Sequence, residues 1–467
     1  MVSASEQLAR NVSWGTFAKA KELQQRLLFT LGILLVYRLG TYIPIPGVNS
    51  DAFSVSMGGG NFGTILDRLN MFSGGAVERM AVFALNVMPY ISASIIMTLM
   101  KGSIPSLKEL DKDGQAGRKQ INQYTRYLTV FLAAFQAYAI AIALQASTAN
   151  DAAGNVIPLV LNPGYFFQAS TVITLVGGTM LLMWLGEQVT ARGVGNGLSL
   201  IIFAGIVAEL PRAITQVLEL YREGSLGGGL ILFILFLFVS LSVLIVFVER
   251  AQRRLLVQYP KRQMAGGKTF GGESSFMPLK LNTPGVIPPI FASALIMLPT
   301  TAFGLILTRQ AENGGQQSEW LASFNAWLAY GNDGYLIMYG LLIVFFCFFY
   351  VPYVFKPEDV ADNLRKNGGF LPGVRPGEAT ANRLSYVLNR LTFIGAFYVA
   401  FVCVVPATVI ARSGGVIPAP VAMMIDGMSL LIIVSVTLDT VSQIQSHLIA
   451  HQYEGLIKKT RMRRRKK

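Results

Sequence analysis

Ten long apolar runs separated by polar segments constrain the fold of this 467-residue chain more than any other feature. A helix rises about 1.5 Å per residue, so about 20 apolar residues cross the hydrocarbon core of a bilayer. Only 14% of the residues are charged, whereas soluble proteins have about 25%. The sequence therefore predicts an all-α polytopic membrane protein. The ten predicted transmembrane helices cover residues 23–43, 76–100, 124–145, 164–185, 196–213, 230–249, 284–307, 335–355, 390–411 and 420–447.

Lysine and arginine are divided unevenly between the two sides predicted for the membrane. The two termini and the loops on their side hold 32 of the 39 basic residues. The positive-inside rule then makes both termini cytoplasmic, together with the long loops 250–282 and 356–389. The net charge of +14 is explained first by this topology and by contact with anionic lipids. The two loops are longer than topology requires, which favours docking of a partner over simple solvated loops.

A broken helix near the start of the chain predicts a hollow in the protein. Residues 64–72 read as a short amphipathic helical segment, which Gly74 and Gly75 separate from the apolar run 76–100. The backbone groups at such a break are satisfied only inside protein or beside an aqueous cavity. A weak internal repeat agrees with a transport fold, because residues 87–94 and 286–293 are identical at five of eight aligned positions.

Few residues are available for catalysis or metal binding. Both cysteines, Cys347 and Cys403, lie in apolar runs, and both histidines, His447 and His451, lie near the C-terminus. We therefore expect no metal, no cofactor and no enzymatic activity. Asp439 is the one carboxylate well inside an apolar run. It keeps open an alternative, a secondary transporter of a small solute.

Several motifs resemble the SecY family of bacterial protein-conducting channels, and they extend from the first span to the tail. These motifs are Asn70–Gly75, Met88–Ile95, Met183–Glu187, Arg192–Gly197, Gly285–Pro288, Ile290–Ser293, Ala361–Leu364 and Gly373–Glu378. The resemblance implies ten helices in two pseudo-symmetric, inverted five-helix halves around a central pore, with a short plug helix. It also implies that unfolded secretory polypeptides pass through the pore and that apolar segments leave sideways into lipid.

The same resemblance implies a domain organisation. Residues 1–22 would be a cytoplasmic segment, 23–215 the N-terminal half with the plug at 62–72, 216–449 the C-terminal half, and 450–467 a basic cytoplasmic tail.

Carried over position by position, the resemblance also implies four sets of site residues. The apolar pore ring would be Val87, Ile91, Leu198, Ile202, Ile290 and Ile432. The plug would contain Thr64, Ile65, Leu66, Asp67, Leu69, Asn70 and Phe72. The lateral gate would contain Ser92, Ser94, Ile290 and Ser293. Partner binding would fall to Arg253, Arg254, Lys261, Arg262, Arg375 and Glu378.

The implied partners are the motor ATPase SecA, the ribosome, secretory and membrane preproteins, and the small subunits SecE and SecG. The implied location is the cell inner membrane. The sequence leaves open whether two copies associate.

Overall fold

The computed structural model describes residues 20–49, 53, 70, 73–146, 148–150, 156–224, 227–259, 262–263, 269–270, 274–312, 318–329, 331–413, 421–422 and 425–465. The chain divides into two compact units. Unit 1 comprises Met1–Gln216, Pro299–Asn325 and Ile432–Lys467, and unit 2 comprises Val217–Leu298 and Ala326–Leu431. This division does not test the predicted boundary between two halves at residue 215.

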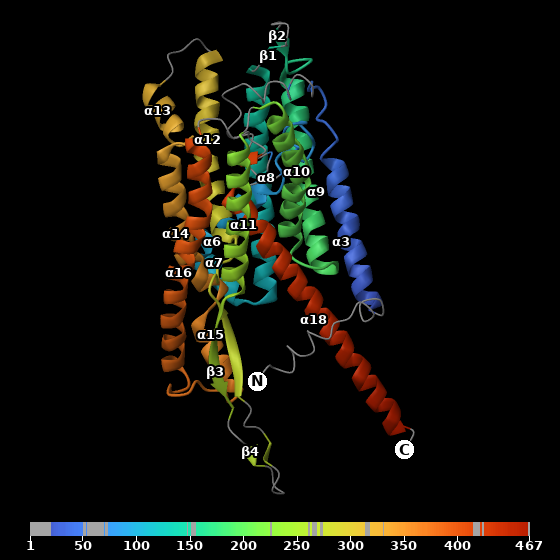
Figure 1. Ribbon diagram of the computed structural model, residues 1–467, viewed down its shortest axis with the longest axis vertical. Helices are drawn as coiled ribbons and strands as arrows, with labels where there is room; N and C mark the ends of the chain where they lie inside the picture. Colours follow the sequence, from blue (N-terminus) through green and yellow to red (C-terminus); the bar gives the residue numbers. More distant parts are fainter. Residues whose placement is uncertain are drawn as a thin grey trace. The chain divides into compact units, whose positions relative to one another are not determined.

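Unit 1 is built from the first helices of the chain (Figure 1). α8 packs along α9 and also against α6 and α7, while α3 packs against α9. Arg126 on α8 pairs with Glu187 on α9 at 2.7 Å, which fixes one end of this antiparallel packing. The helices are α3 (Lys21–Gly40), α6 (Met88–Ser103), α7 (Pro105–Lys112), α8 (Gln115–Ala146), α9 (Tyr165–Arg192) and α10 (Gly197–Arg222).

Unit 1 also contains shorter or later elements. Strands β1 (Thr148–Asn150) and β2 (Val156–Pro158) form an antiparallel pair between α8 and α9. α13 (Glu319–Trp327) lies mostly in this unit, as does α18 (Gly427–Arg465). α18 is 39 residues long, about 58 Å, and so extends beyond the predicted span 420–447.

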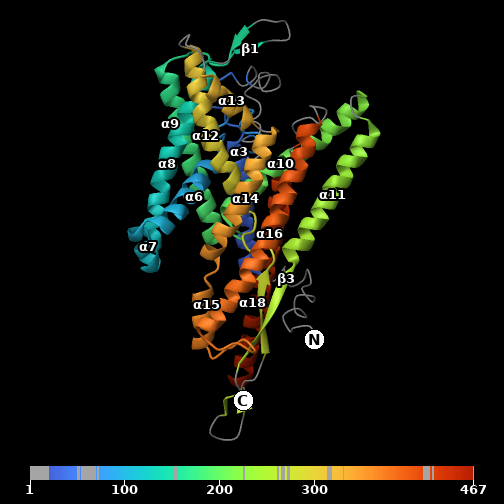
Figure 2. The same cartoon turned by 90° about the vertical axis from the view of Figure 1, so that its left-hand side faces the viewer.

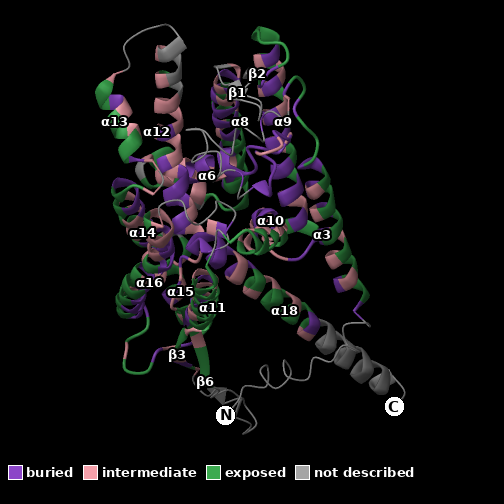
Figure 3. Ribbon diagram, turned by 45° about the horizontal axis from the view of Figure 1, so that its top comes forward, coloured by how far each residue is buried: buried purple, intermediate pink, exposed green. Residues whose placement is uncertain are grey.

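Unit 2 is a second helical body with an extended hairpin. α14 (Asp333–Val354) packs along α16 (Glu378–Arg412), and α15 (Pro357–Lys366) packs against α16 (Figure 2). α11 (Gly228–Arg250) belongs to this unit, and α12 (Ile287–Glu312) begins in it. Exposed residues lie along α11, α14 and α16 (Figure 3), and many of them are apolar, as expected for helices that face lipid.

The loop predicted at 250–282 contains a β-hairpin that the sequence reading missed. β3 (Gln252–Gln258) pairs antiparallel with β6 (Ser274–Lys280), and β4 (Arg262–Gln263) pairs with β5 (Thr269–Phe270). The loop predicted at 356–389 contains α15 and the first turns of α16.

Each of the ten predicted spans corresponds to a helix among the described residues, but the second was predicted wrongly at its start. Residues 76–87 form turns, and α6 begins only at Met88. Several of their backbone hydrogen bonds close local turns, such as that from Ala81 N–H to the Ala76 carbonyl at 2.7 Å. Two others join the chain after α3: Ile45 N–H donates to the Met80 carbonyl at 2.8 Å, and Val82 N–H to the Ile43 carbonyl at 2.9 Å. Met80 and Asn86 have positive φ values, 43° and 50°, which a helix excludes.

Eight of the described helices are long and apolar enough to cross a membrane by length and composition. The other two predicted spans correspond to α3 and α6. α6 has 16 residues, about 24 Å, and is shorter than the roughly 30 Å core. α3 contains four charged residues, Lys21, Glu22, Arg26 and Arg38.

Candidate functional site

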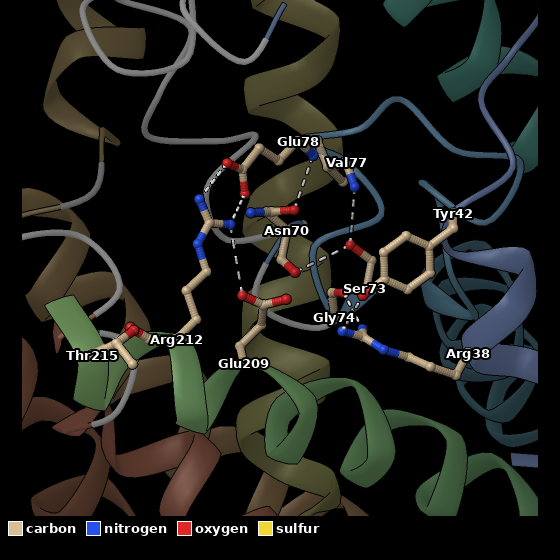
Figure 4. A network of polar contacts seen from close by, with 10 residues as sticks. All are labelled: Arg38, Tyr42, Asn70, Ser73, Gly74, Val77, Glu78, Glu209, Arg212 and Thr215. Carbon is tan, nitrogen blue, oxygen red and sulfur yellow. Dashed lines mark hydrogen bonds and ion pairs between the residues drawn. The ribbon is translucent and has the colours of Figure 1, made fainter. Parts of the chain in front are cut away.

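The segment between α3 and α6 takes part in a network of polar contacts (Figure 4). We call residues 73–87 the return segment, because they lead the chain back from the predicted plug to α6. Most of the return segment is buried, including Ala76, Val77 and Phe83. A buried irregular backbone must find partners for its polar groups. Local turns, residues 43–45 and side chains of α3 supply them, while α10 pairs with a side chain of the segment.

α3 holds the beginning of the return segment through two side chains. Arg38 Nη1 donates to the Gly74 carbonyl at 2.7 Å, and the Tyr37 hydroxyl donates to the Ser73 carbonyl at 3.1 Å. Tyr37 is fully buried and its ring stacks on Phe83. The guanidinium groups of Arg38 and Arg79 both lie over the Tyr42 ring, at 5.0 and 4.3 Å from its centroid. The start of the return segment is therefore fixed to the last turns of α3.

Asn70 and Ser73 close the chain onto itself where the predicted plug ends. The Ser73 hydroxyl donates to the Asn70 carbonyl at 3.1 Å, and the Glu78 backbone N–H donates to Asn70 Oδ1 at 3.0 Å. The Val77 backbone N–H donates to the Ser73 hydroxyl at 3.3 Å. These bonds resemble a helix cap, in which a short polar side chain satisfies the exposed N–H groups.

α10 holds the middle of the return segment through a two-pronged ion pair. Arg212 donates from both terminal nitrogens to the Glu78 carboxylate, with Nη2 2.6 Å from Oε1. Glu209 lies 4.0 Å from the same guanidinium. Glu78 lies outside the spanning helices, and the hydrogen bonds from Arg212 hold its pKa below the ordinary value, although partial burial opposes the shift.

Two glycines permit the close approach between the return segment and α10. Gly74 and Gly75 have φ values of +65° and +80°, a region that favours glycine. A Cβ atom at Gly74 would meet the Gly205 Cα atom of α10 at 3.0 Å. Both backbone conformation and space therefore require glycine here.

The network lies immediately after the predicted plug. Of the predicted plug residues, the structure describes Asn70, which is buried. Thr64, Ile65, Leu66, Asp67, Leu69 and Phe72 lie outside the described residues.

The predicted ring residues are divided between the two units. Val87 caps the N-terminus of α6 and is fully buried, and Ile91 follows in the first turn of that helix. Leu198 and Ile202 lie one turn apart at the start of α10, and Ile432 is buried on α18. Ile290 lies on α12 in unit 2. The complete ring therefore stays a prediction.

The predicted gate residues lie on α6 and α12. Ser92 is buried and Ser94 is half-buried on α6. On α12 the Ser293 hydroxyl donates to the Ile290 carbonyl at 2.9 Å. A serine bonded to its own helix in this way satisfies its hydroxyl donor within the helix. The gate assignment is untested.

The predicted partner-binding residues belong to a packed module of unit 2. The hairpin and the loop after α15 are joined by two backbone hydrogen bonds between Gln258 and Phe370, of 2.9 and 3.0 Å. An apolar cluster lies beneath this junction and contains Val257, Leu371 and Leu384. The module therefore has its own core.

Its basic side chains point away from that core. Arg253 and Arg254 are exposed on β3, and Arg375 is exposed in the loop before α16. The Thr380 hydroxyl donates to the Arg375 carbonyl at 2.9 Å, which fixes the loop. Glu378 is the exposed first residue of α16. Arg262 lies in β4, and Lys261 lies outside the described residues.

Asp439 is the carboxylate on which the alternative hypothesis of a small-solute transporter depended, and it is exposed on α18. The described residues contain no cluster of three His, Cys, Asp or Glu side chains that could hold a metal ion.

Sequence reasoning missed the ion pair of the return segment, although its members were visible. Arg38, Glu78, Arg79, Glu209 and Arg212 all lie near the less basic side of the membrane. The available signal was that opposite charges flank separate apolar runs on the same side of the membrane, where they could pair. Only the fold shows that α3 and α10 converge on the same fifteen-residue segment.

The fold matches those of solved protein-conducting channels. A structure described as that of a protein-conducting channel has a TM-score of 0.65 at 17% identity, covering 91% of this chain and 92% of its own. Sec61 in a canine ribosome–channel complex has a TM-score of 0.60 at 16% identity, with the same coverage. These structures show a ten-helix fold in two halves, which confirms the predicted fold class.

Sequence comparison gives the family. The SecY family model matches residues 81–441. Protein translocase subunit SecY of Rickettsia typhi is 46% identical over 95% of this chain and 98% of its own length, and that of Escherichia coli is 44% identical over 95% of both. The chain belongs to the SecY family. It is a multi-pass membrane protein and a protein-conducting channel, as predicted from the motifs.

Proposed function

We propose that the return segment anchors the plug of this channel at rest. The observation that carries the proposal is the double attachment of residues 73–78, through Arg38 to α3 and through Arg212 to α10. With its C-terminal end held on two helices, the predicted plug 62–72 has a fixed point about which to move. The pore itself is sealed by the apolar ring, which makes no specific polar interaction with the substrate.

The seal itself is the apolar ring of Val87, Ile91, Leu198, Ile202, Ile290 and Ile432. Branched apolar side chains form a dry constriction that opposes water and ion passage. They also offer a moving polypeptide no polar partner that would hold it. Polypeptides cross through this ring, and sufficiently apolar segments leave between α6 and α12, past Ser92, Ser94 and Ser293.

The channel lies in the cell inner membrane with both termini in the cytoplasm. The positive-inside distribution supports this orientation. The hairpin β3–β6 and the loop before α16 then face the cytoplasm and dock the motor SecA or the ribosome through Arg253, Arg254 and Arg375. A related fold, Sec61, was solved in a ribosome–channel complex, which supports ribosome docking. SecE and SecG complete the complex by family inference.

The driving energy comes from these partners and not from hydrolysis by this chain. Secretory and membrane preproteins are the substrates, and no cofactor takes part.

Photo-crosslinking of an arrested precursor tests the proposed path. A photoreactive amino acid replaces Ile91 or Ile432 in the reconstituted complex, and the precursor is stalled during export. Crosslinks from both positions, and none from the lipid-facing position Phe397, support the path. Crosslinks that are equal at all three positions, or absent from both ring positions, contradict it.

A further inference from the structure

One face of α16 changes from basic to aromatic to apolar where the helix enters the membrane. Arg383, Tyr386 and Arg390 lie three and four residues apart, so they share one side of the helix. Residues 391–411 contain no charged side chain, which places Arg390 at the boundary of the apolar span. The neighbouring face is buried, with Leu384, Val387 and Leu391 packed in unit 2.

The Tyr386 ring contacts the guanidinium groups of both arginines. The Arg390 guanidinium carbon lies 4.4 Å from the Tyr386 ring centroid, and that of Arg383 lies 5.7 Å from it. These are cation–π distances, so one exposed ring holds two positive charges near each other. Within the part of the chain that the structure describes, neither guanidinium forms an ion pair. Both retain their N–H groups for an external anion.

The face continues into the membrane as a ladder of aromatic rings. Phe393, Phe397 and Phe401 are exposed at helical spacing below Arg390, and the Phe393 and Phe397 ring centroids lie 4.8 Å apart. Aromatic residues followed by charge are typical of a membrane–water interface. A ligand that fits the whole face needs an anionic head and long apolar chains.

We propose that Arg383, Tyr386 and Arg390 bind the phosphate of an anionic phospholipid, whose acyl chains lie along Phe393, Phe397 and Phe401. Arginine suits this role because its planar donors match phosphate oxygens in pairs. An RNA or an acidic protein would satisfy the arginines but leave the phenylalanine ladder without a role. Arg383 and Tyr386 lie at the C-terminal end of the predicted docking loop 356–389, and Arg390 follows directly after it. The site lies in the cytoplasmic leaflet if the proposed orientation holds.

Native mass spectrometry of the purified complex in detergent tests the site. Phosphatidylglycerol and phosphatidylcholine with the same acyl chains are titrated separately. Wild type should retain phosphatidylglycerol in preference to phosphatidylcholine. Arg383→Gln/Arg390→Gln should weaken phosphatidylglycerol binding by roughly fivefold for each guanidinium removed and leave phosphatidylcholine unchanged. Tyr386→Leu should give a smaller loss.

The control removes two exposed basic residues from another helix of the same side, Arg118→Gln/Lys119→Gln on α8. The proposal predicts a clearly smaller effect in this control. Unchanged phosphatidylglycerol binding in the α16 double variant overturns the proposal, as does an equal loss in the control. Unchanged lipid binding with reduced ribosome binding would assign the arginines to RNA instead. Retained wild-type thermal stability of the variants shows that folding is intact.

Discussion

Arg212 on α10 and Glu78 in the return segment form a two-pronged ion pair across 134 positions of sequence. The pair is partly buried, with side-chain exposures of 41% and 20%. It joins a helix that carries two predicted ring residues to the segment that follows the predicted plug. Loss of this pair should therefore increase ion leak through the resting channel before it unfolds the protein.

Replacing Arg212 with Gln should increase ion leak through the resting channel. The change leaves the Glu78 carboxylate with a neutral partner and should cost about 1–3 kcal/mol of local stability. Conductance of the reconstituted complex in planar bilayers measures the leak. The exchanged pair Glu78→Arg/Arg212→Glu should restore part of the seal, as a double-mutant cycle requires. A leak no greater than that of wild type in Arg212→Gln would argue against anchoring.

Gly74→Ala should loosen the same anchor for a steric reason. The added Cβ meets α10 backbone at 3.0 Å and occupies a positive-φ conformation. The left-handed conformation alone costs about 1–2 kcal/mol. Gly114→Ala is the matched control, because Gly114 has φ +68° with nothing within 4 Å. Ion leak should rise in Gly74→Ala and stay at the wild-type level in Gly114→Ala. Equal leak in both variants would show that the close approach of Gly74 to Gly205 does not contribute to the seal.

Acid should weaken the pair through Glu78. Because the folded-state pKa of Glu78 lies below its ordinary value of 4.5, the pair contributes fully above that value. Its contribution is lost as pH falls below 4.5 toward the lowered pKa. Thermal unfolding of wild type and Glu78→Gln should therefore differ at pH 7 and converge progressively below pH 4.5. A difference that stays constant across this range would show that Glu78 contributes nothing through its charge.

Asparagine at Ile432 should open the proposed ring to ions. Ile432 is buried, and a polar side chain in a dry constriction favours water there. Ile433→Asn is the control, since the next residue points about 100° away around the helix. Single-channel recordings should show leak in Ile432→Asn and in Ile91→Asn, and more leak after deletion of residues 62–72. Silent recordings from all three would contradict the assigned ring and plug.

Charge reversal at Arg375 should impair motor-driven export more than folding. Arg375→Glu places a carboxylate where an acidic partner surface is expected and should lower export by roughly tenfold. The exposed Arg365 on α15 provides the control Arg365→Glu. Binding of SecA and export of a precursor are both measured. Normal binding and export in Arg375→Glu would remove Arg375 from the docking surface.

The apolar runs predicted the spanning helices because lipid imposes length and composition on them. The same rule failed at residues 76–87, which are as apolar as a span but are buried within protein. There, local turns and backbone hydrogen bonds to residues 43–45 replace the hydrogen bonds of a helix. Composition does not distinguish these two arrangements. The start of α6 could not be read from hydropathy.

The polar network of the return segment was not predicted. Motifs gave the family and its expected ring, whereas the pairing of Glu78 with Arg212 depends on two distant segments meeting. Sequence gives each charge but not its partner. The helix α15 was not predicted, because residues 356–389 were interpreted as a loop. Pro357 at its start and Arg365 and Lys366 in its last turn are nevertheless ordinary boundary signals.

Export into liposomes tests the central claim most directly. The chain is reconstituted with its small partner subunits, and SecA, ATP and an unfolded secretory precursor are added. If the chain is a polypeptide channel, we expect the precursor to become protected from external protease only when ATP is present. An unprotected precursor, with the complex folded and SecA bound, would contradict the account.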